Sequence, residues 1–212
     1  MSALPLAKVY PITGCPNLSG LTHLQLAQSF LRAGIRFFQV RDKRLPDHQY
    51  YHQLIQIKAL CEKYDAQFVI NDRIDLVLAV GADGVHLGQK DLSVKIARRL
   101  LGKEAIIGLS THTRQQFKDA QLQDLSYLAI GPIFSTKTKP DTEPVLGVKA
   151  LPQLISGSQY PVVAIGGISV EKALSVWQAG VDSVAIISDI THAPNPEKKV
   201  DDYLILSKKA GT

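Results

Sequence analysis

Eight short apolar runs alternate with helix-length segments along the chain, and this alternation limits the folds that the sequence can adopt. The runs are rich in β-branched or aromatic residues and are bounded by Gly, Asp or other polar residues, which is typical of strands buried on both faces of a parallel sheet. They comprise residues 9–13, 36–40, 67–70, 84–87, 105–109, 127–130, 161–165 and 183–187.

The segments between these runs have apolar residues spaced three and four apart, as in amphipathic helices. Leu24, Ala27 and Phe30 form one such stripe, and similar spacing recurs near 51–59, 94–101, 115–122, 148–155, 171–179 and 198–210. Strict alternation favours parallel strands with right-handed crossovers, and a count of eight favours a closed barrel over an open doubly wound sheet. We therefore expect an α/β fold, a (β/α)8 TIM barrel in which residues 1–212 form a single domain.

The composition fits an enzyme better than a nucleic-acid-binding or membrane protein. Apolar residues make up 45% of the 212 residues, the net charge is +5, and Lys and Arg are spread along the chain without a basic block. A modest excess of cations also suits polyanionic small-molecule substrates. We expect no nucleic-acid partner, and the sequence leaves a homo-oligomer open.

The N-terminus lacks the apolar core of a signal peptide, and no apolar run is long enough to span a membrane. Cys15 and Cys61 match neither a metal-binding spacing nor a disulfide framework. These features predict a cytoplasmic protein with reduced thiols, in which Cys61 is inert.

In a TIM barrel the chemistry belongs to the carboxyl ends of the strands and the loops that follow them. Gln39, Arg41 and Lys43 follow the second run at intervals of two. Side chains two apart on an extended chain point the same way, so these three can converge on one anion. The alternative is a basic strand end paired with surface carboxylates.

Two carboxylates follow the next strands, since Asn71 and Asp72 come after the third run and Asp91 comes shortly after the fourth. Carboxylates at adjacent strand ends, near a cationic clamp, indicate Mg²⁺ held by one or two Asp together with substrate phosphates. The alternative is that each Asp caps the helix after it.

The fifth run leads into Ser110 and His112. We expect Ser110 to face the ligand, and Thr111 or Thr113 to cap the next helix. His112 is a candidate for proton transfer because it alone among the histidines clearly follows a strand, although a lone histidine is more often structural. His86 lies within a run and is not counted with the site.

A second anion site is indicated at the later strands. Gly166 and Gly167 follow the seventh run and would let a phosphate approach backbone amides, and a helix start after the eighth run adds more donors. Residues 131–140, after the sixth run, supply Ser, Thr and Lys side chains that suit phosphate oxygens, although such a loop can also be a solvated turn. A diphosphate facing a monophosphate is the simplest matching pair of ligands.

Longer motifs at these positions resemble those of the thiamine phosphate synthase (thiamine-phosphate pyrophosphorylase) family, from about Tyr10 to Ile190. The motifs are Gln39-Val-Arg-Asp-Lys43, Asn71-Asp-Arg-Ile-Asp-Leu76, Gly81-Ala-Asp-Gly-Val-His-Leu-Gly-Gln89, Gly108-Leu-Ser-Thr-His112, Gly131-Pro-Ile-Phe-Ser-Thr-Lys-Thr-Lys139, Ala164-Ile-Gly-Gly-Ile168 and Ile187-Ser188.

This resemblance implies a Mg²⁺-dependent enzyme that joins hydroxymethylpyrimidine diphosphate to thiazole phosphate and releases pyrophosphate. The residues that match the pyrimidine diphosphate site are Gln39, Arg41, Lys43, Asn71, Ser110 and Lys139. Those that match the metal ligands are Asp72 and Asp91, and those that match the thiazole phosphate site are Thr136, Thr138, Gly167, Ile187 and Ser188. The catalytic roles would fall to Arg41, Lys43, Ser110 and Lys139.

The chain departs from the family pattern at two positions. The first run ends Ile12-Thr-Gly-Cys15, where an acidic residue often follows the threonine, and Asp189 follows Ser188, where a small apolar residue is commoner. Asp189 could place negative charge near the thiazole phosphate. The rival interpretations are a thiazole tautomerase that uses His112, a catalytically inactive paralogue that binds phosphorylated ligands, and an unrelated barrel enzyme with one phosphorylated substrate.

Overall fold

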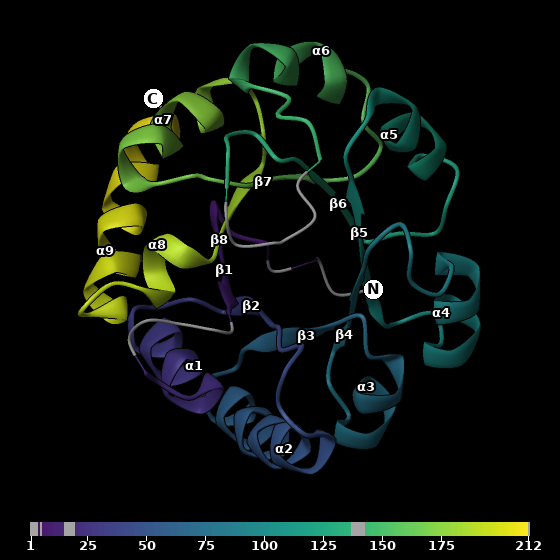
Figure 1. Cartoon of the computed structure of the whole chain (residues 1–212), viewed down its shortest axis with the longest axis vertical. Helices are drawn as coiled ribbons and strands as arrows, with labels where there is room; N and C mark the ends of the chain where they lie inside the picture. Colours follow the sequence, from purple (N-terminus) through teal and green to yellow (C-terminus); the bar gives the residue numbers. More distant parts are fainter. Residues whose placement is uncertain (1–3, 5, 15–19, 137–142, 212) are drawn as a thin grey trace.

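The computed structural model describes residues 4, 6–14, 20–136 and 143–211. Parallel strands form a closed barrel in chain order, with β8 paired to β1, and the helices surround it (Figure 1). The strands are β1 (Val9–Thr13), β2 (Phe37–Val40), β3 (Gln67–Asn71), β4 (Gly84–Leu87), β5 (Ile106–Thr111), β6 (Tyr127–Ile130), β7 (Val162–Ile165) and β8 (Ser183–Ile186). The predicted TIM barrel is thus confirmed.

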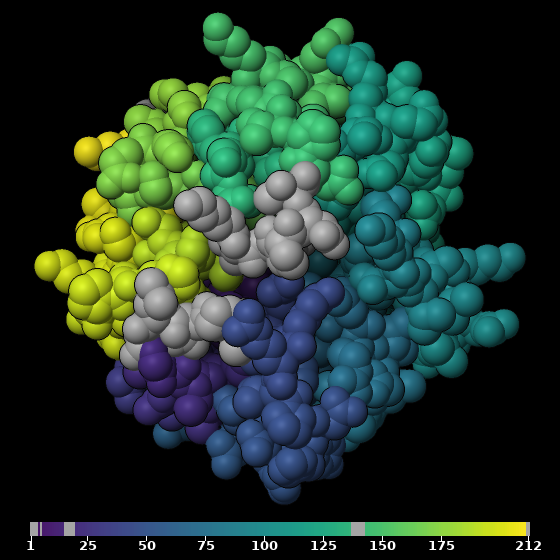
Figure 2. Space-filling model, viewed as in Figure 1, coloured from purple at the N-terminus to yellow at the C-terminus, as the bar shows by residue number. Residues whose placement is uncertain are grey.

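The helices follow the strands around the ring. They are α1 (His23–Arg32), α2 (Asp47–Lys63), α3 (Ile74–Val80), α4 (Val94–Leu101), α5 (Arg114–Ala120), α6 (Leu151–Ile155), α7 (Val170–Gln178), α8 (Ser188–Thr191) and α9 (Pro196–Ser207), with 3₁₀ turns at Val148–Ala150 and Lys208–Gly211. In the space-filling view the purple of α1 and the yellow of α9 lie on neighbouring parts of the rim, as expected for a ring closed between the two ends of the chain (Figure 2).

The strands bury two separate apolar layers. The layer between barrel and helices is the larger one and includes Phe38, Phe68 and Leu128. Inside the barrel, a second layer contains Tyr10, Phe37, Val69, Tyr127, Ala129, Val163 and Ala185, which belong to strands around the whole ring. Because side chains alternate along each strand, every strand except β4 contributes to both layers, and the barrel interior is packed.

Short-range signals explain where several helices begin. Ser93 and Thr113 accept hydrogen bonds from backbone N–H groups in the first turns of α4 and α5, so the expected cap at Thr113 is confirmed. Thr111 instead donates to the Ala129 carbonyl within the sheet. Helix α3 was not among the segments expected from spacing, because apolar residues occupy nearly all of its seven positions and leave no stripe.

Two further expectations concern Cys61 and the helices, away from the mouth of the barrel. Cys61 is fully buried in α2, and burial raises the pKa of its thiol to about 12, which keeps it unreactive. Within the part of the chain that the structure describes, each helix is too short or too polar to cross a lipid bilayer.

Candidate active site

A cavity of about 450 Å³ opens at the carboxyl ends of the strands. Ten of the described residues expected at the site line this cavity, and they come from the ends of seven strands, β2 to β8, or from the loops after them. They are Arg41, Lys43, Asn71, Asp72, Asp91, Ser110, Thr136, Gly167, Ile187 and Ser188. Gln39 lies deeper and lines a narrow extension of the cavity that Arg41, Asn71 and Ser110 share.

The cationic side of the cavity is formed by the loop after β2. Arg41 is buried, at 7% exposure, and its Nε is a buried atom with no hydrogen-bond partner among the described residues. Asn71 Nδ2, on the neighbouring strand, is likewise a buried atom with no hydrogen-bond partner among the described residues. Because an unpaired buried donor costs free energy, these two atoms indicate where a ligand with acceptor oxygens would bind.

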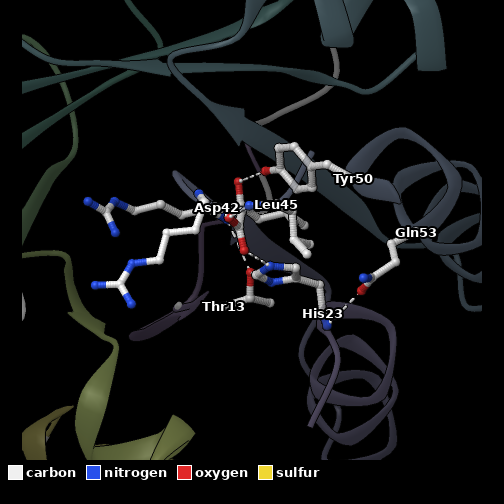
Figure 3. A network of polar contacts seen from close by, with 9 residues as sticks. Thr13, His23, Asp42, Leu45, Tyr50 and Gln53 are labelled. Atoms are coloured by element: carbon white, nitrogen blue, oxygen red, sulfur yellow. Dashed lines mark hydrogen bonds and ion pairs between the residues drawn. The ribbon is translucent and has the colours of Figure 1, made fainter. Parts of the chain in front are cut away.

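A buried polar network holds the backbone of this loop (Figure 3). His23, at the start of α1, contacts Thr13 Oγ1 through Nδ1 at 2.8 Å and Asp42 Oδ2 through Nε2 at 2.7 Å. Thr13 Oγ1 accepts the Arg41 backbone N–H at 3.1 Å, and Asp42 Oδ1 accepts the backbone N–H of Leu45 at 2.7 Å. The network therefore ties β1, α1 and the loop that carries Arg41 into one unit.

The ionised form of Asp42 is strongly favoured within this network. Burial opposes ionisation, but the hydrogen bond from His23 and those from backbone N–H groups outweigh it, so the pKa of Asp42 lies well below its ordinary value. A carboxylate at Oδ2 can only accept, so His23 Nε2 donates.

Two carboxylates face each other beside the cationic loop. Asp72 Oδ2 lies 3.0 Å from Lys43 Nζ, and Asp91 Oδ2 accepts the Gly88 N–H at 2.7 Å. Partial burial, and next the contact with the Asp72 carboxyl, raise the pKa of Asp91 above its ordinary value. Neither Asp is a helix cap, because the caps are Arg73 for α3 and Ser93 for α4, so the capping alternative is wrong.

The opposite side of the cavity presents backbone groups and hydroxyls. Gly166 and Gly167, after β7, both have positive φ angles, of 104° and 63°. A Cβ added at Gly166 would stand 2.7 Å from the Pro132 Cα, and one at Gly167 would stand 2.9 Å from the Phe134 Cβ. Glycine therefore allows the loop after β6 to pack against this turn.

Asp189 lies away from the cavity. Its Oδ2 accepts the Tyr203 O–H at 2.7 Å and lies 3.9 Å from Lys199 Nζ, both on α9. The same Tyr203 hydroxyl donates to the Ile168 carbonyl at 3.3 Å. The negative charge that the sequence places next to Ser188 is thus directed at α9, and Asp189 is not among the residues that line the cavity.

Sequence reasoning missed a row of polar side chains inside the barrel. Gln39 Nε2 donates to Tyr10 OH at 3.1 Å, and Tyr10 OH lies 2.7 Å from Tyr127 OH. His86 Nδ1 lies 2.8 Å from Tyr127 OH, and its Nε2 lies 2.8 Å from Ser110 Oγ. Because side chains alternate along a strand, the alternation that starts at Gly84 could have predicted that His86 points into the barrel.

His112 lines the cavity, as expected for a residue after β5. Its Nδ1 lies 2.7 Å from the Gly131 carbonyl oxygen, which can only accept, so Nδ1 carries a hydrogen. Other cavity residues that the sequence did not single out include Gln89, Lys90, Glu143 and Ile165. Two residues expected at the site, Thr138 and Lys139, lie outside the described residues.

Comparisons with known proteins show which family the sequence and the fold resemble. Residues 9–190 match the sequence profile of the family described as thiamine monophosphate synthase. A thiamine-phosphate synthase from Archaeoglobus fulgidus is 40% identical over 191 residues, covering 90% of this chain and 89% of its own. One from Pelotomaculum thermopropionicum is 36% identical and covers 94% and 92%. A solved thiamine phosphate pyrophosphorylase from Pyrococcus furiosus has a TM-score of 0.86 at 30% identity, with 96% of each chain covered.

Proposed function

Because the chain belongs to the thiamine monophosphate synthase family and is a transferase that forms thiamine phosphate, we propose how it does so. The substrates are 4-amino-2-methyl-5-hydroxymethylpyrimidine diphosphate and a thiazole phosphate, and the products are thiamine phosphate and pyrophosphate. The reaction is a Mg²⁺-assisted dissociative displacement, carried out by one domain that spans residues 1–212.

The observation that carries this proposal is the division of the cavity into two anion-binding sides. Arg41 and Lys43 stand beside the carboxylates of Asp72 and Asp91 on one side, and the Gly166–Gly167 turn lines the cavity after β7. Cations combined with carboxylates suit a diphosphate that arrives with a metal ion, whereas amides and hydroxyls suit a monophosphate. An enzyme with one phosphorylated substrate would need only one of these sides.

The donor set fits Mg²⁺ that is bound jointly by protein and substrate. Among the described residues there is no group of three or more His, Cys, Asp or Glu side chains that could enclose a metal ion. Mg²⁺ is commonly held by one or two carboxylates together with phosphate oxygens, and Asp72 and Asp91 would supply them here. When bound, the ion would neutralise negative charge on the diphosphate oxygens as the carbon–oxygen bond weakens.

The side chains have defined tasks in the displacement. Pyrophosphate leaves from a benzylic-type carbon whose cation is stabilised by the electron-rich aminopyrimidine ring, so no strong base is needed. Arg41 and Lys43, with Lys139 by family resemblance, bind the departing pyrophosphate, while Gln39, Asn71 and Ser110 orient the pyrimidine. Thr136, Thr138, Gly167, Ile187 and Ser188 hold the thiazole phosphate, so that the thiazole nitrogen faces the reacting carbon.

Purified protein mixed with both substrates should release pyrophosphate and thiamine phosphate in equal amounts, and chelation of divalent metal should stop both. The control omits the thiazole phosphate and should release far less pyrophosphate. Equal release without the thiazole phosphate would mean simple diphosphate hydrolysis. Isomerisation of a thiazole substrate without pyrophosphate release would support the tautomerase alternative, in which His112 transfers the proton.

A further inference from the structure

The row of polar side chains inside the barrel joins two residues that face the substrates. Its ends are Gln39 and Ser110, which line the cavity or its deeper extension, and its middle members are Tyr10, Tyr127 and His86. Of the middle members, His86 also borders the cavity, Tyr10 borders the extension, and Tyr127 is not among the lining residues of either. The five residues come from β2, β1, β6, β4 and β5, so the row crosses the barrel interior and does not follow one strand. Tyr10 and Tyr127 are at most 1% exposed, so protein atoms, not bulk water, surround their hydroxyls.

The direction of every hydrogen in this row follows from its first link. Gln39 Nε2 can only donate, so the Tyr10 oxygen accepts. Tyr127 is the other hydrogen-bond partner of the buried Tyr10 hydroxyl among the described residues, so the Tyr10 O–H donates to the Tyr127 oxygen, because a buried O–H without an acceptor would cost free energy. The Tyr127 O–H then donates to His86 Nδ1. A ring nitrogen that accepts carries no hydrogen, so neutral His86 carries its proton on Nε2 and donates it to Ser110 Oγ.

Packing holds the row in this arrangement. The His86 and Tyr127 rings stack with centroids 5.5 Å apart, and Tyr10 stacks on Phe37 at 5.1 Å. A Cβ at Gly108 would overlap the Tyr127 ring and stand 2.6 Å from His86 Nδ1, so glycine leaves room for the link between them. Burial also raises the pKa of Tyr10 and of Tyr127 above the ordinary value, which keeps both hydroxyls protonated.

We propose that Tyr10, Tyr127 and His86 are positioning residues that couple the hydrogen-bonding roles of Gln39 and Ser110. With the hydrogens in this direction, Ser110 Oγ accepts a hydrogen bond from His86 Nε2–H and offers its own O–H as a donor to the ligand. Gln39 keeps Oε1 as an acceptor for the ligand. Reversing the direction of one hydrogen bond in the row would reverse the direction of the others. Gln39 and Ser110 therefore present their acceptor and donor groups together. The proposal rests on the synthase reaction proposed above and concerns how its substrate-facing groups are held.

The tautomer of His86 tests the polarity without any assay of activity. In ¹⁵N NMR spectra of the unliganded protein, the His86 signals, identified by their loss in His86→Gln, should show a protonated Nε2 and an unprotonated Nδ1. Tyr127→Phe removes the donor to Nδ1 and should weaken this preference. A wild-type His86 protonated on Nδ1 would overturn the proposal.

Kinetics test whether the row matters for the reaction. Tyr127→Phe and Tyr10→Phe should each lower kcat/KM by about tenfold, the factor that corresponds to one oriented buried hydrogen bond. Because the row acts as a unit, the double variant should lose little more than either single variant. The matched control is Tyr160→Phe, which removes a hydroxyl bonded to the Gln123 carbonyl, outside the cavity lining, and should retain full activity.

Two histidine variants separate orientation from packing. His86→Gln keeps an amide N–H that reaches toward Ser110, and it should retain more activity than His86→Leu at equal thermal stability. Unchanged kcat/KM in Tyr127→Phe, or strictly multiplicative losses in the double variant, would overturn the inference while leaving the synthase function intact. A wild-type protein that forms no thiamine phosphate would instead refute the proposed function, and the tautomer measurement would still decide the polarity.

Discussion

Asp72 has a rare backbone conformation, and its carboxyl group lies next to a second carboxyl group. Its φ angle is +62°, in the left-handed region that Asp and Asn tolerate better than most residues, and its carboxyl contacts that of Asp91. Such features collect at functional sites, where the rest of the fold supports the strain. We therefore expect Asp72 to serve the ligand through its position and charge, and not the stability of the loop.

Asp72→Asn should consequently separate activity from stability. Asn accepts the same φ angle but removes the like-charge contact, so the melting temperature should stay equal or rise by a few degrees. Turnover should fall by about 10²-fold, in line with the loss of one preorganised electrostatic group, and more Mg²⁺ should be needed to reach the maximum rate. Steady-state rates across a Mg²⁺ titration, with a thermal melt, would measure both.

Asp75→Asn is the matched control for this substitution. It makes the same chemical change three residues away, where the carboxylate pairs with Arg73 on the outside of the barrel. Exposed pairs contribute little, so activity and melting temperature should stay near those of the wild type. A large loss of stability in Asp72→Asn would contradict the view that this carboxylate serves the ligand.

Asp42 provides the opposite case, a buried carboxylate that stabilises the fold. Its pKa is depressed, so its contribution is present at and above about pH 4 and is lost as the pH falls through the folded-state pKa. Asp42→Asn places an N–H group opposite the His23 Nε2–H and should lower the free energy of unfolding by about 1–3 kcal/mol at pH 7.

Urea unfolding from pH 3 to pH 8 would check this prediction. The difference between wild type and Asp42→Asn should begin to shrink as the pH falls below about 4, because Asp42 then takes up a proton in the unfolded chain while the folded protein keeps it ionised. Arg41 shares the network, so the affinity for pyrophosphate should also fall. Asp47→Asn, which alters an exposed carboxylate bonded to Arg73, should show little of either effect. A stability difference that does not depend on pH would argue against an ionised Asp42.

At the scale of the elements, the turn after β7 packs closely against the loop after β6, and glycine makes this close packing possible. Gly167→Ala forces a side chain into a left-handed residue and into contact with Phe134. We expect a loss of about 1–2 kcal/mol of stability and a KM for the thiazole phosphate raised by about tenfold, since the amides of this turn would shift. Kinetics with each substrate varied in turn would measure it.

Gly157→Ala separates backbone strain from the clash. Gly157 has a φ angle of +76°, but a Cβ there would meet nothing within 4 Å, and the residue does not line the cavity. It should lose comparable stability from strain and keep the wild-type KM. If both variants changed the KM for the thiazole phosphate equally, the turn after β7 would not be a phosphate site.

The elements were predictable from the sequence because each strand is a compact apolar run with clear boundaries. The sequence also predicted that Asp72 and Asp91 lie close together, because the ends of neighbouring parallel strands meet at the same edge of the sheet. They could not reveal that His23 contacts Asp42, or that Tyr10 reaches Tyr127 across 117 residues, because these contacts depend on helix placement and barrel closure. Helix α3 escaped because it is apolar on nearly all sides.

At the scale of the whole molecule, the site exists only when the barrel is closed. Helix α9 packs on α1 and α7, and Tyr203 links it to Asp189 and to the Ile168 carbonyl beside the anion-binding turn. The cavity takes residues from loops after β2 through β8, so no smaller part of the chain can form it. Ligands that bind the cavity must therefore stabilise the entire fold by mass action.

This linkage leads to a prediction about Mg²⁺ and pyrophosphate together. The raised pKa of Asp91 means that stability is lost as the pH rises through that pKa, because the carboxylate ionises beside Asp72. Mg²⁺ should offset this loss, and pyrophosphate should complete its coordination. At neutral pH, the two ligands together should raise the melting temperature by more than the sum of their separate effects.

Saturation at about 100 times the dissociation constant corresponds to about 2.7 kcal/mol, or a rise of about 5–10 °C for a domain of this size. Differential scanning calorimetry at pH 4 and pH 7.5 would measure it, with sulfate at equal ionic strength as the anion control. The synergy should shrink at pH 4, where Asp91 is more protonated, and in Asp91→Asn. Strictly additive shifts would mean that metal and pyrophosphate bind apart, since a shared site requires each ligand to strengthen the other.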